Sequence, residues 1–72
     1  MEIYRNLGNN SGVARFEIGA DYITVLFKGG KKPYRWSYRK AGQSHVENMK
    51  QLAKSGHGLN SYIMKQVKNS FD

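Results

Sequence analysis

Residues 31–40 read KKPYRWSYRK, and this stretch decides how the chain folds. Aromatic residues at positions 34, 36 and 38 alternate with polar residues at positions 35, 37 and 39. Such a period of two is typical of a β-strand, whose successive side chains point to opposite faces. The pattern predicts a strand over residues 34–38 with an aromatic face and a cationic face. Pro33 suits the first residue of a strand at the edge of a sheet.

Two earlier runs alternate in the same way. In residues 13–18 we expect Phe16 and Ile18 to share one face, with Val13 on the opposite face beside Arg15 and Glu17. Turn residues at 19–21 lead into a second run over 22–28, and two glycines at 29 and 30 make the next turn. Three strands joined by short turns predict an antiparallel meander.

Beyond residue 42 the period changes to that of a helix. The apolar residues Val46, Met49, Leu52 and Ala53 predict an amphipathic helix over about 43–54, and Gly56 suits its left-handed cap. A second helix is expected over about 59–69, with the lysines at 50, 54, 65 and 68 on the outer faces. The predicted fold is α+β, a three-stranded antiparallel meander followed by two helices packed on one face (β-β-β-α-α).

The length allows one domain, residues 1–72, in which 1–10 are expected to form an N-terminal arm and 11–72 the core. The chain lacks cysteine and carries a formal net charge of +7, which favours polyanionic partners. It shows neither an apolar stretch long enough for a membrane span nor the pattern of a signal peptide. We expect a cytoplasmic protein without membrane association.

One face of the predicted sheet is apolar and aromatic, and burial against the helices favours it as the inner face. The rings of the third strand are then mostly structural, although one of them could still serve as a platform for base stacking. The cations would line the open face and its edge as a nucleic-acid-binding surface. This predicted surface comprises Arg15, Lys28, Lys31, Lys32, Arg35 and Arg39.

The sequence SGHG at 55–58 leads into the second helix and offers a candidate anion site at Lys54, His57 and Gly58. The alternative is a glycine cap, a tight turn and an Asn or Ser, at position 60 or 61, that caps the next helix, and this is the interpretation that we favour. The acids are scattered singly, and the two histidines lack metal-ligand spacing. We therefore expect no catalytic residues, no metal site and no cofactor, and we do not expect an enzyme.

The C-terminal string AKSGHGLNSYIMKQV, with Ser55, Gly56, Asn60 and Ile63, resembles the closing motif of the KTSC domain, which occurs at the C-terminus of some lysyl-tRNA synthetases and as a small bacterial or phage protein. The family's Tyr-x-Tyr falls on residues 34–36, where Trp replaces the second Tyr, and the Ser and apolar strand at its start fall on 11–13. The similarity spans about residues 11–71. The family's Val-Pro pair is missing, so the resemblance does not define where the third strand ends and the first helix begins. The resemblance implies an α+β fold and a suggested role in RNA binding.

Two functions remain open from the sequence. The first is a small basic module that binds nucleic acid, RNA more than DNA, through phosphate contacts on the cationic sheet face. The alternative is an interaction protein, an adaptor or phage-type inhibitor that binds an acidic protein surface or an anionic nucleotide ligand. We expect a monomer or a weak homodimer formed through a sheet edge, which Pro33 and nearby charges discourage.

Overall fold

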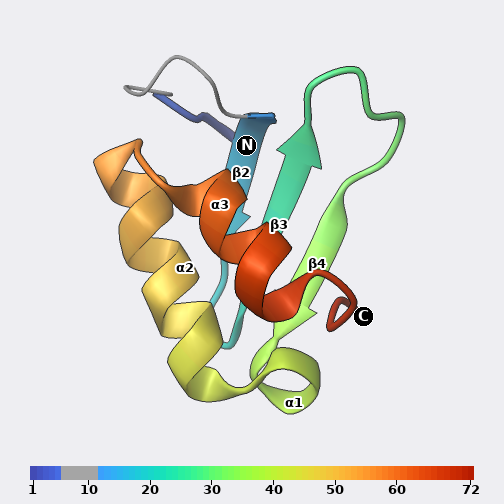
Figure 1. Ribbon diagram of the computed structural model, residues 1–72, viewed down its shortest axis with the longest axis vertical. Helices are drawn as coiled ribbons and strands as arrows, with labels where there is room; N and C mark the ends of the chain where they lie inside the picture. Colours follow the sequence, from blue (N-terminus) through green and yellow to red (C-terminus); the bar gives the residue numbers. More distant parts are fainter. Residues whose placement is uncertain (6–11) are drawn as a thin grey trace.

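The computed structural model describes residues 1–5 and 12–72, and Figure 1 shows two helical segments crossing the same face of one sheet. The strands are β1 (Glu2–Ile3), β2 (Val13–Ile18), β3 (Tyr22–Phe27) and β4 (Tyr34–Ser37). The helices are α1 (Tyr38–Ala41), α2 (Gln43–Ser55) and α3 (Leu59–Tyr62), and α3 continues into a π-helical turn, η1 (Ile63–Val67). In the described part of the chain, no helix is long and apolar enough to span a membrane.

The sheet is antiparallel with strand order β1-β2-β3-β4, so the predicted α+β class and the meander of β2, β3 and β4 are confirmed. The prediction of three strands was incomplete, because β1 adds a fourth strand beside β2. Pairing of Glu2 with Phe16 brings Tyr4 into the core, where its ring contacts Phe16 edge to face. Residues 1–5 are therefore part of the folded unit rather than a separate arm, while the rest of the expected arm lies outside the described residues.

The core lies between the helices and the predicted inner face of the sheet. Of the eight residues expected on that face, Phe16, Ile23, Val25 and Trp36 are buried. The other four are partly buried against them: Ile18, Phe27, Tyr34 and Tyr38. The helices contribute Val46, Met49, Ala53, Leu59, Ile63 and Val67. Trp36 is only 1% exposed, and its Nε1 donates a hydrogen bond of 2.8 Å to the carbonyl oxygen of Val67. The period-two pattern of residues 34–37 therefore identified the buried face correctly.

Val13 lies in the core, and its predicted place on the outer face is wrong. Val13 pairs with Phe27. Arg15, two residues later on β2, pairs with Leu26, which is only one residue away from Phe27 on β3. The extra residue on β2 forms a β-bulge, and a bulge reverses the side to which preceding side chains point. Residues after the bulge keep the predicted alternation, whereas Val13 before it turns inward.

The third predicted strand ends earlier than expected. Ser37 takes the N-cap position of α1, and its Oγ accepts a hydrogen bond from the backbone N–H of Lys40 at 3.2 Å. Serine at this position satisfies an amide that a new helix leaves unpaired. Tyr38 and Arg39 consequently lie on α1 rather than on the strand. Arg39 is thus at the end of β4 instead of on the open sheet face.

The second helix is shorter than predicted and ends at Val67. Beyond it the chain returns to the edge of the sheet, where the N–H of Asp72 donates to the carbonyl oxygen of Arg35 at 2.7 Å. This return brings Phe71 against Tyr34, with the ring centroids 4.8 Å apart and the planes at 85°. Phe71, which falls four residues after Val67 and would continue the apolar face of a longer helix, therefore contacts the sheet from a segment beyond the helix.

Gly56, the predicted cap of α2, has φ of 77°, and a Cβ on it would lie 2.5 Å from the Cβ of Arg5. We expect Gly56→Ala to cost about 1–2 kcal/mol for the left-handed backbone and about 1–3 kcal/mol more for displacing the N-terminal residues. Gly29→Ala is the matched control, because Gly29 has φ of 72° and nothing within 4 Å of its added Cβ. Urea unfolding of both variants tests this; equal losses would contradict the contact with Arg5.

Candidate nucleic-acid interface

The outer face of the sheet carries Arg15 and Arg35, both exposed as predicted, but it also carries aromatic, acidic and aliphatic side chains. The guanidinium carbon of Arg35 lies 5.1 Å from the ring centroid of Tyr22, whose hydroxyl donates to Glu17 at 3.3 Å. Ile3, beside Arg15 on the neighbouring strand, is 69% exposed. This face is therefore a mixed surface with two arginines rather than a uniformly basic one.

The lysines of the β3–β4 loop form the densest group of predicted cations. Lys28, Lys31 and Lys32 are all exposed, and Figure 1 shows their loop projecting beyond the strands at the upper right. The turn is closed by a hydrogen bond from the N–H of Gly30 to the carbonyl oxygen of Phe27 at 2.9 Å. We call these three residues the loop lysines.

The loop lysines are not neutralised within the described chain. Across residues 1–5 and 12–72 the one ion pair joins Lys50 to Glu47, which lie on α2. The ammonium groups of the loop are thus free to meet an external anion. Arg35 extends this cationic region along β4, and Arg39 lies on α1 at the other end of that strand.

The candidate anion site at Lys54, His57 and Gly58 offers few free backbone N–H groups to an anion. Gly58 takes a left-handed conformation with φ of 84° and precedes the four-residue helix α3. The first amide of α3, on Leu59, already donates to the hydroxyl of the buried Tyr4 at 3.2 Å. Lys54 and His57 are exposed. Gly56 is the left-handed C-cap of α2, as the favoured interpretation expected. The expected cap of the second helix by an Asn or Ser is wrong, because the N-cap of α3 is Gly58, which has no side chain to accept a hydrogen bond.

A hollow that the sequence did not reveal opens between β4 and the C-terminal residues. It has a volume of about 310 Å³ and is lined mainly by aromatic and aliphatic side chains. Phe71 borders it and contacts Tyr34, and this contact depends on the return of the chain after Val67. The only signal in the sequence was the apolar character of Phe71, four residues after Val67. The lining residues are Phe27, Tyr34, Trp36, Ile63, Met64, Lys68, Asn69 and Phe71.

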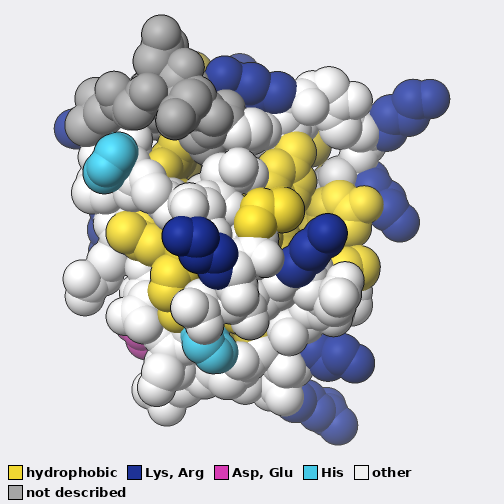
Figure 2. Space-filling view, viewed as in Figure 1, with side chains coloured by type: hydrophobic (Ala, Val, Ile, Leu, Met, Phe, Trp, Pro, Cys, Tyr) yellow, Lys and Arg dark blue, Asp and Glu magenta, His cyan; other side chains and the backbone are white. Residues whose placement is uncertain are grey.

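A second hollow of about 400 Å³ adjoins the first, and the two share Tyr34 and Phe71. Its other lining residues are Lys32, Pro33, Arg35 and Asp72, so two of the predicted binding cations border it. Figure 2, which views the helix side, shows an apolar patch right of the centre with Lys and Arg side chains beside it and very little acidic surface. Aromatic and cationic groups thus meet at this edge of the sheet.

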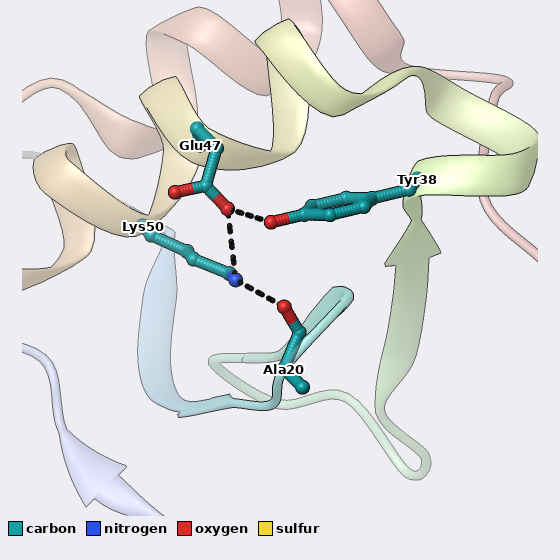
Figure 3. A network of polar contacts seen from close by, with 4 residues as sticks. All are labelled: Ala20, Tyr38, Glu47 and Lys50. Atoms are coloured by element: carbon teal, nitrogen blue, oxygen red, sulfur yellow. Dashed lines mark hydrogen bonds and ion pairs between the residues drawn. The ribbon is translucent and has the colours of Figure 1, made fainter.

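A polar network at the other end of β4 involves Lys50, which is buried at 8% exposure, contrary to its predicted place on an outer face (Figure 3). Its Nζ lies 2.9 Å from Oε2 of Glu47 and 3.2 Å from the carbonyl oxygen of Ala20. The hydroxyl of Tyr38 donates to the same carboxylate oxygen. The network joins α1, α2 and the β2–β3 turn, which accounts for the burial of a lysine.

The three groups shift one another's pKa. The hydrogen bond from Tyr38, then that from Lys50, lowers the pKa of Glu47 below its ordinary 4.5. The hydrogen bond to Glu47 raises the pKa of Tyr38 above 10.0. Desolvation alone would lower the pKa of Lys50, but its bonds to Glu47 and Tyr38 outweigh this effect and raise it above 10.5.

These directions predict a two-sided pH profile of stability. The contribution of Glu47 is present above its ordinary pKa of 4.5 and is lost as pH falls through its lower folded-state pKa. Those of Tyr38 and Lys50 are present below 10.0 and 10.5 and are lost as pH rises through their higher folded-state values. We expect Glu47→Gln to reduce both slopes when Tm is measured against pH. Glu17→Gln controls for the loss of one negative charge; an unchanged Glu47→Gln profile would contradict this network.

The histidines and acids do not assemble a metal site in the described part of the chain, where no three such side chains gather. His45, on α2, instead has its Nδ1 2.7 Å from the hydroxyl of Tyr62. Nδ2 of Asn48 donates to the same hydroxyl at 3.2 Å. These contacts join α2 to α3.

Comparisons of this chain with models of protein families, with curated proteins and with solved structures find no match. We therefore infer function from the residues of the site and their chemistry.

Proposed function

We propose that this chain is a small RNA-binding module that holds the phosphates of its ligand with the loop lysines and Arg35, with little preference for sequence. Arg15 and Arg39 lie at the margins of this surface and would contribute to longer ligands. The residues suggest binding and not catalysis, so we do not propose an enzyme, and we place its action in the cytoplasm.

The observation that carries the proposal is the cluster of exposed loop lysines without an ion-pair partner among the described residues. Clustered ammonium groups attract phosphates, because binding releases the counterions that a nucleic acid condenses around itself. The formal charge of +7 adds long-range attraction. An acidic protein would meet the same charges, and this alternative is an outcome of the experiments below.

The direct test is a titration of labelled single-stranded RNA, with DNA of the same sequence alongside, at several salt concentrations. We expect binding at low salt that weakens with a log–log slope of about −0.7 for each phosphate contacted. Binding to neither nucleic acid would refute the proposal, and binding to DNA alone would refute the preference for RNA. A protein partner that is retained after nuclease treatment would favour the interaction protein.

We propose that the chain acts as a monomer. The edge of β4 is partly occupied, since the N–H of Asp72 donates to Arg35 and the hydroxyl of Ser37 donates to the Asp72 side chain at 2.8 Å. Pro33 precedes this strand, and the opposite edge strand, β1, has only two residues. Short or occupied edges offer little for pairing with a second copy. Sedimentation at increasing concentration tests this; a concentration-dependent dimer would contradict it.

We further propose that the chain is a KTSC-type domain, on the order and spacing of the motifs at 11–13, 34–36 and 55–63. An experimental structure of a KTSC domain provides the test. The proposal requires a superposition in which strands, helices and these motifs coincide, and a different strand order would refute it.

A further inference from the structure

We propose that the hollow bordered by Tyr34 and Phe71 takes one unpaired base of a single-stranded RNA, while Lys68 and Lys32 hold the phosphates beside that base. This inference rests on the proposed RNA binding and specifies its substrate class. It assigns a recognition role to side chains outside the six predicted cations. It also predicts discrimination against double-stranded RNA, whose bases are stacked and paired.

The size and lining of the hollow suit an aromatic ligand. Its volume of about 310 Å³ lies at the lower end of the range of about 300–1,000 Å³ that is typical of small-molecule pockets. Tyr34 and Phe71 are partly exposed and meet edge to face, so together they give the hollow an aromatic wall. Met64, 46% exposed, borders the same space with an adaptable side chain.

Polar groups at the hollow match those of a nucleotide. The side chains of Asn69 and Lys68 line it, and both are exposed. Neither makes a hydrogen bond or ion pair to any described residue, so their donors and the amide acceptor are available. An amide can bond to the edge of a base, and an ammonium group can bond to phosphate.

The adjoining hollow extends the match to the sugar and phosphate. The ammonium group of Lys32 lies 6.0 Å from the ring centroid of Tyr34, so a cation stands directly beside the aromatic surface. Arg35 and Asp72 border the same space. The carboxylate of Asp72, which already accepts from Ser37, is an acceptor suited to a ribose hydroxyl. A purely apolar ligand would make no use of these charged groups.

Three probes separate this inference from the proposed function: a single-stranded RNA decamer, the same strand in a duplex, and a decamer of equal charge whose sugars lack bases. We expect the single strand to bind about 5- to 150-fold more tightly than the abasic strand, the range found for stacking of one base on an aromatic side chain. The duplex should also bind more weakly than the single strand. If the abasic strand or the duplex binds equally well, the base site is refuted and phosphate binding stands. If no probe binds, both proposals fail.

Fluorescence of Trp36 gives a second reading, because it is the chain's single tryptophan and lines the hollow. We expect saturating single-stranded RNA to quench or shift this emission, and saturating abasic strand to leave it unchanged. The same change with both ligands would contradict insertion of a base.

Variants then assign the side chains. Phe71→Leu keeps an apolar contact but removes the ring, and Asn69→Ala removes the free amide; both should reduce the preference for the single strand over the abasic strand. Lys68→Ala should weaken binding, whereas Lys65→Ala is the matched control, because Lys65 is exposed on η1, just before Lys68, but lies outside the hollow. Equal effects of the two lysines, or an unchanged preference in both Phe71→Leu and Asn69→Ala, would overturn the assignment. Thermal unfolding of each variant verifies that it is folded.

Discussion

Replacement of Trp36 by alanine is expected to unfold the protein. The side chain is 1% exposed, and it joins β4 to the end of η1 through the bond to Val67. Loss of a buried tryptophan costs about 3–5 kcal/mol. A domain of this size rarely has more than about 3–5 kcal/mol available from its core. The variant should therefore lose its cooperative unfolding transition at 25 °C.

Trp36→Phe is the matched variant, because it keeps an aromatic ring in the same position. It loses the indole donor, but the carbonyl oxygen of Val67 still accepts from the N–H of Ser70 at 2.9 Å. We expect a loss of about 1–2 kcal/mol and a retained fold. Urea unfolding followed by far-UV circular dichroism is suitable, since both variants lack the only fluorescent indole. A Trp36→Ala midpoint equal to that of wild type would contradict the account of the core.

Neutralising the three loop lysines together is expected to have the largest effect on binding. Each exposed contact between an ammonium group and a phosphate contributes up to about 1 kcal/mol, which is roughly fivefold in affinity. Loss of Lys28, Lys31 and Lys32 by substitution with glutamine should thus weaken RNA binding on the order of a hundredfold. Their exposure predicts little change in stability.

The control for this variant carries glutamine at Lys40, Lys54 and Lys65, which are exposed and lie outside the β3–β4 loop. Each triple variant reduces the formal charge from +7 to +4, so a difference between them reports position and not net charge. We expect the control to lose several-fold less affinity than the loop variant. Equal losses would show that RNA responds to total charge alone.

Much of the fold could be predicted from the sequence because its periodicity is strong. Alternation at 34–37 placed Trp36 inside and Arg35 outside, and the stripe from Val46 to Ala53 placed α2 on the inner face. Other features depend on single contacts, which produce no periodic pattern in the sequence. The bulge before Arg15 turned Val13 inward, and the cap formed by Ser37 moved Arg39 from the strand to α1. Strand β1 has only two residues, too few for any pattern.

The candidate site was less accessible to prediction, because it combines residues that are far apart in the chain. The loop lysines could be found by their charge, although Lys28 was expected at the end of the second strand, which stops at Phe27. The hollow requires Phe71 to meet Tyr34, a contact made after the chain leaves η1 and returns to β4. Burial of Lys50 likewise depends on Tyr38 and Glu47 meeting across α1 and α2. Helical periodicity alone assigns a lysine to solvent and cannot indicate such a partner.

The most direct measurement is the salt dependence of RNA binding by the wild-type chain, the loop variant and its charge-matched control. If the ammonium groups between β3 and β4 hold phosphates, the log–log slope of the loop variant should be shallower than that of wild type by about 2, at about 0.7 for each contact removed. The control should keep nearly the wild-type slope. A loop variant whose slope equals that of wild type would contradict the assignment of phosphate binding to this loop.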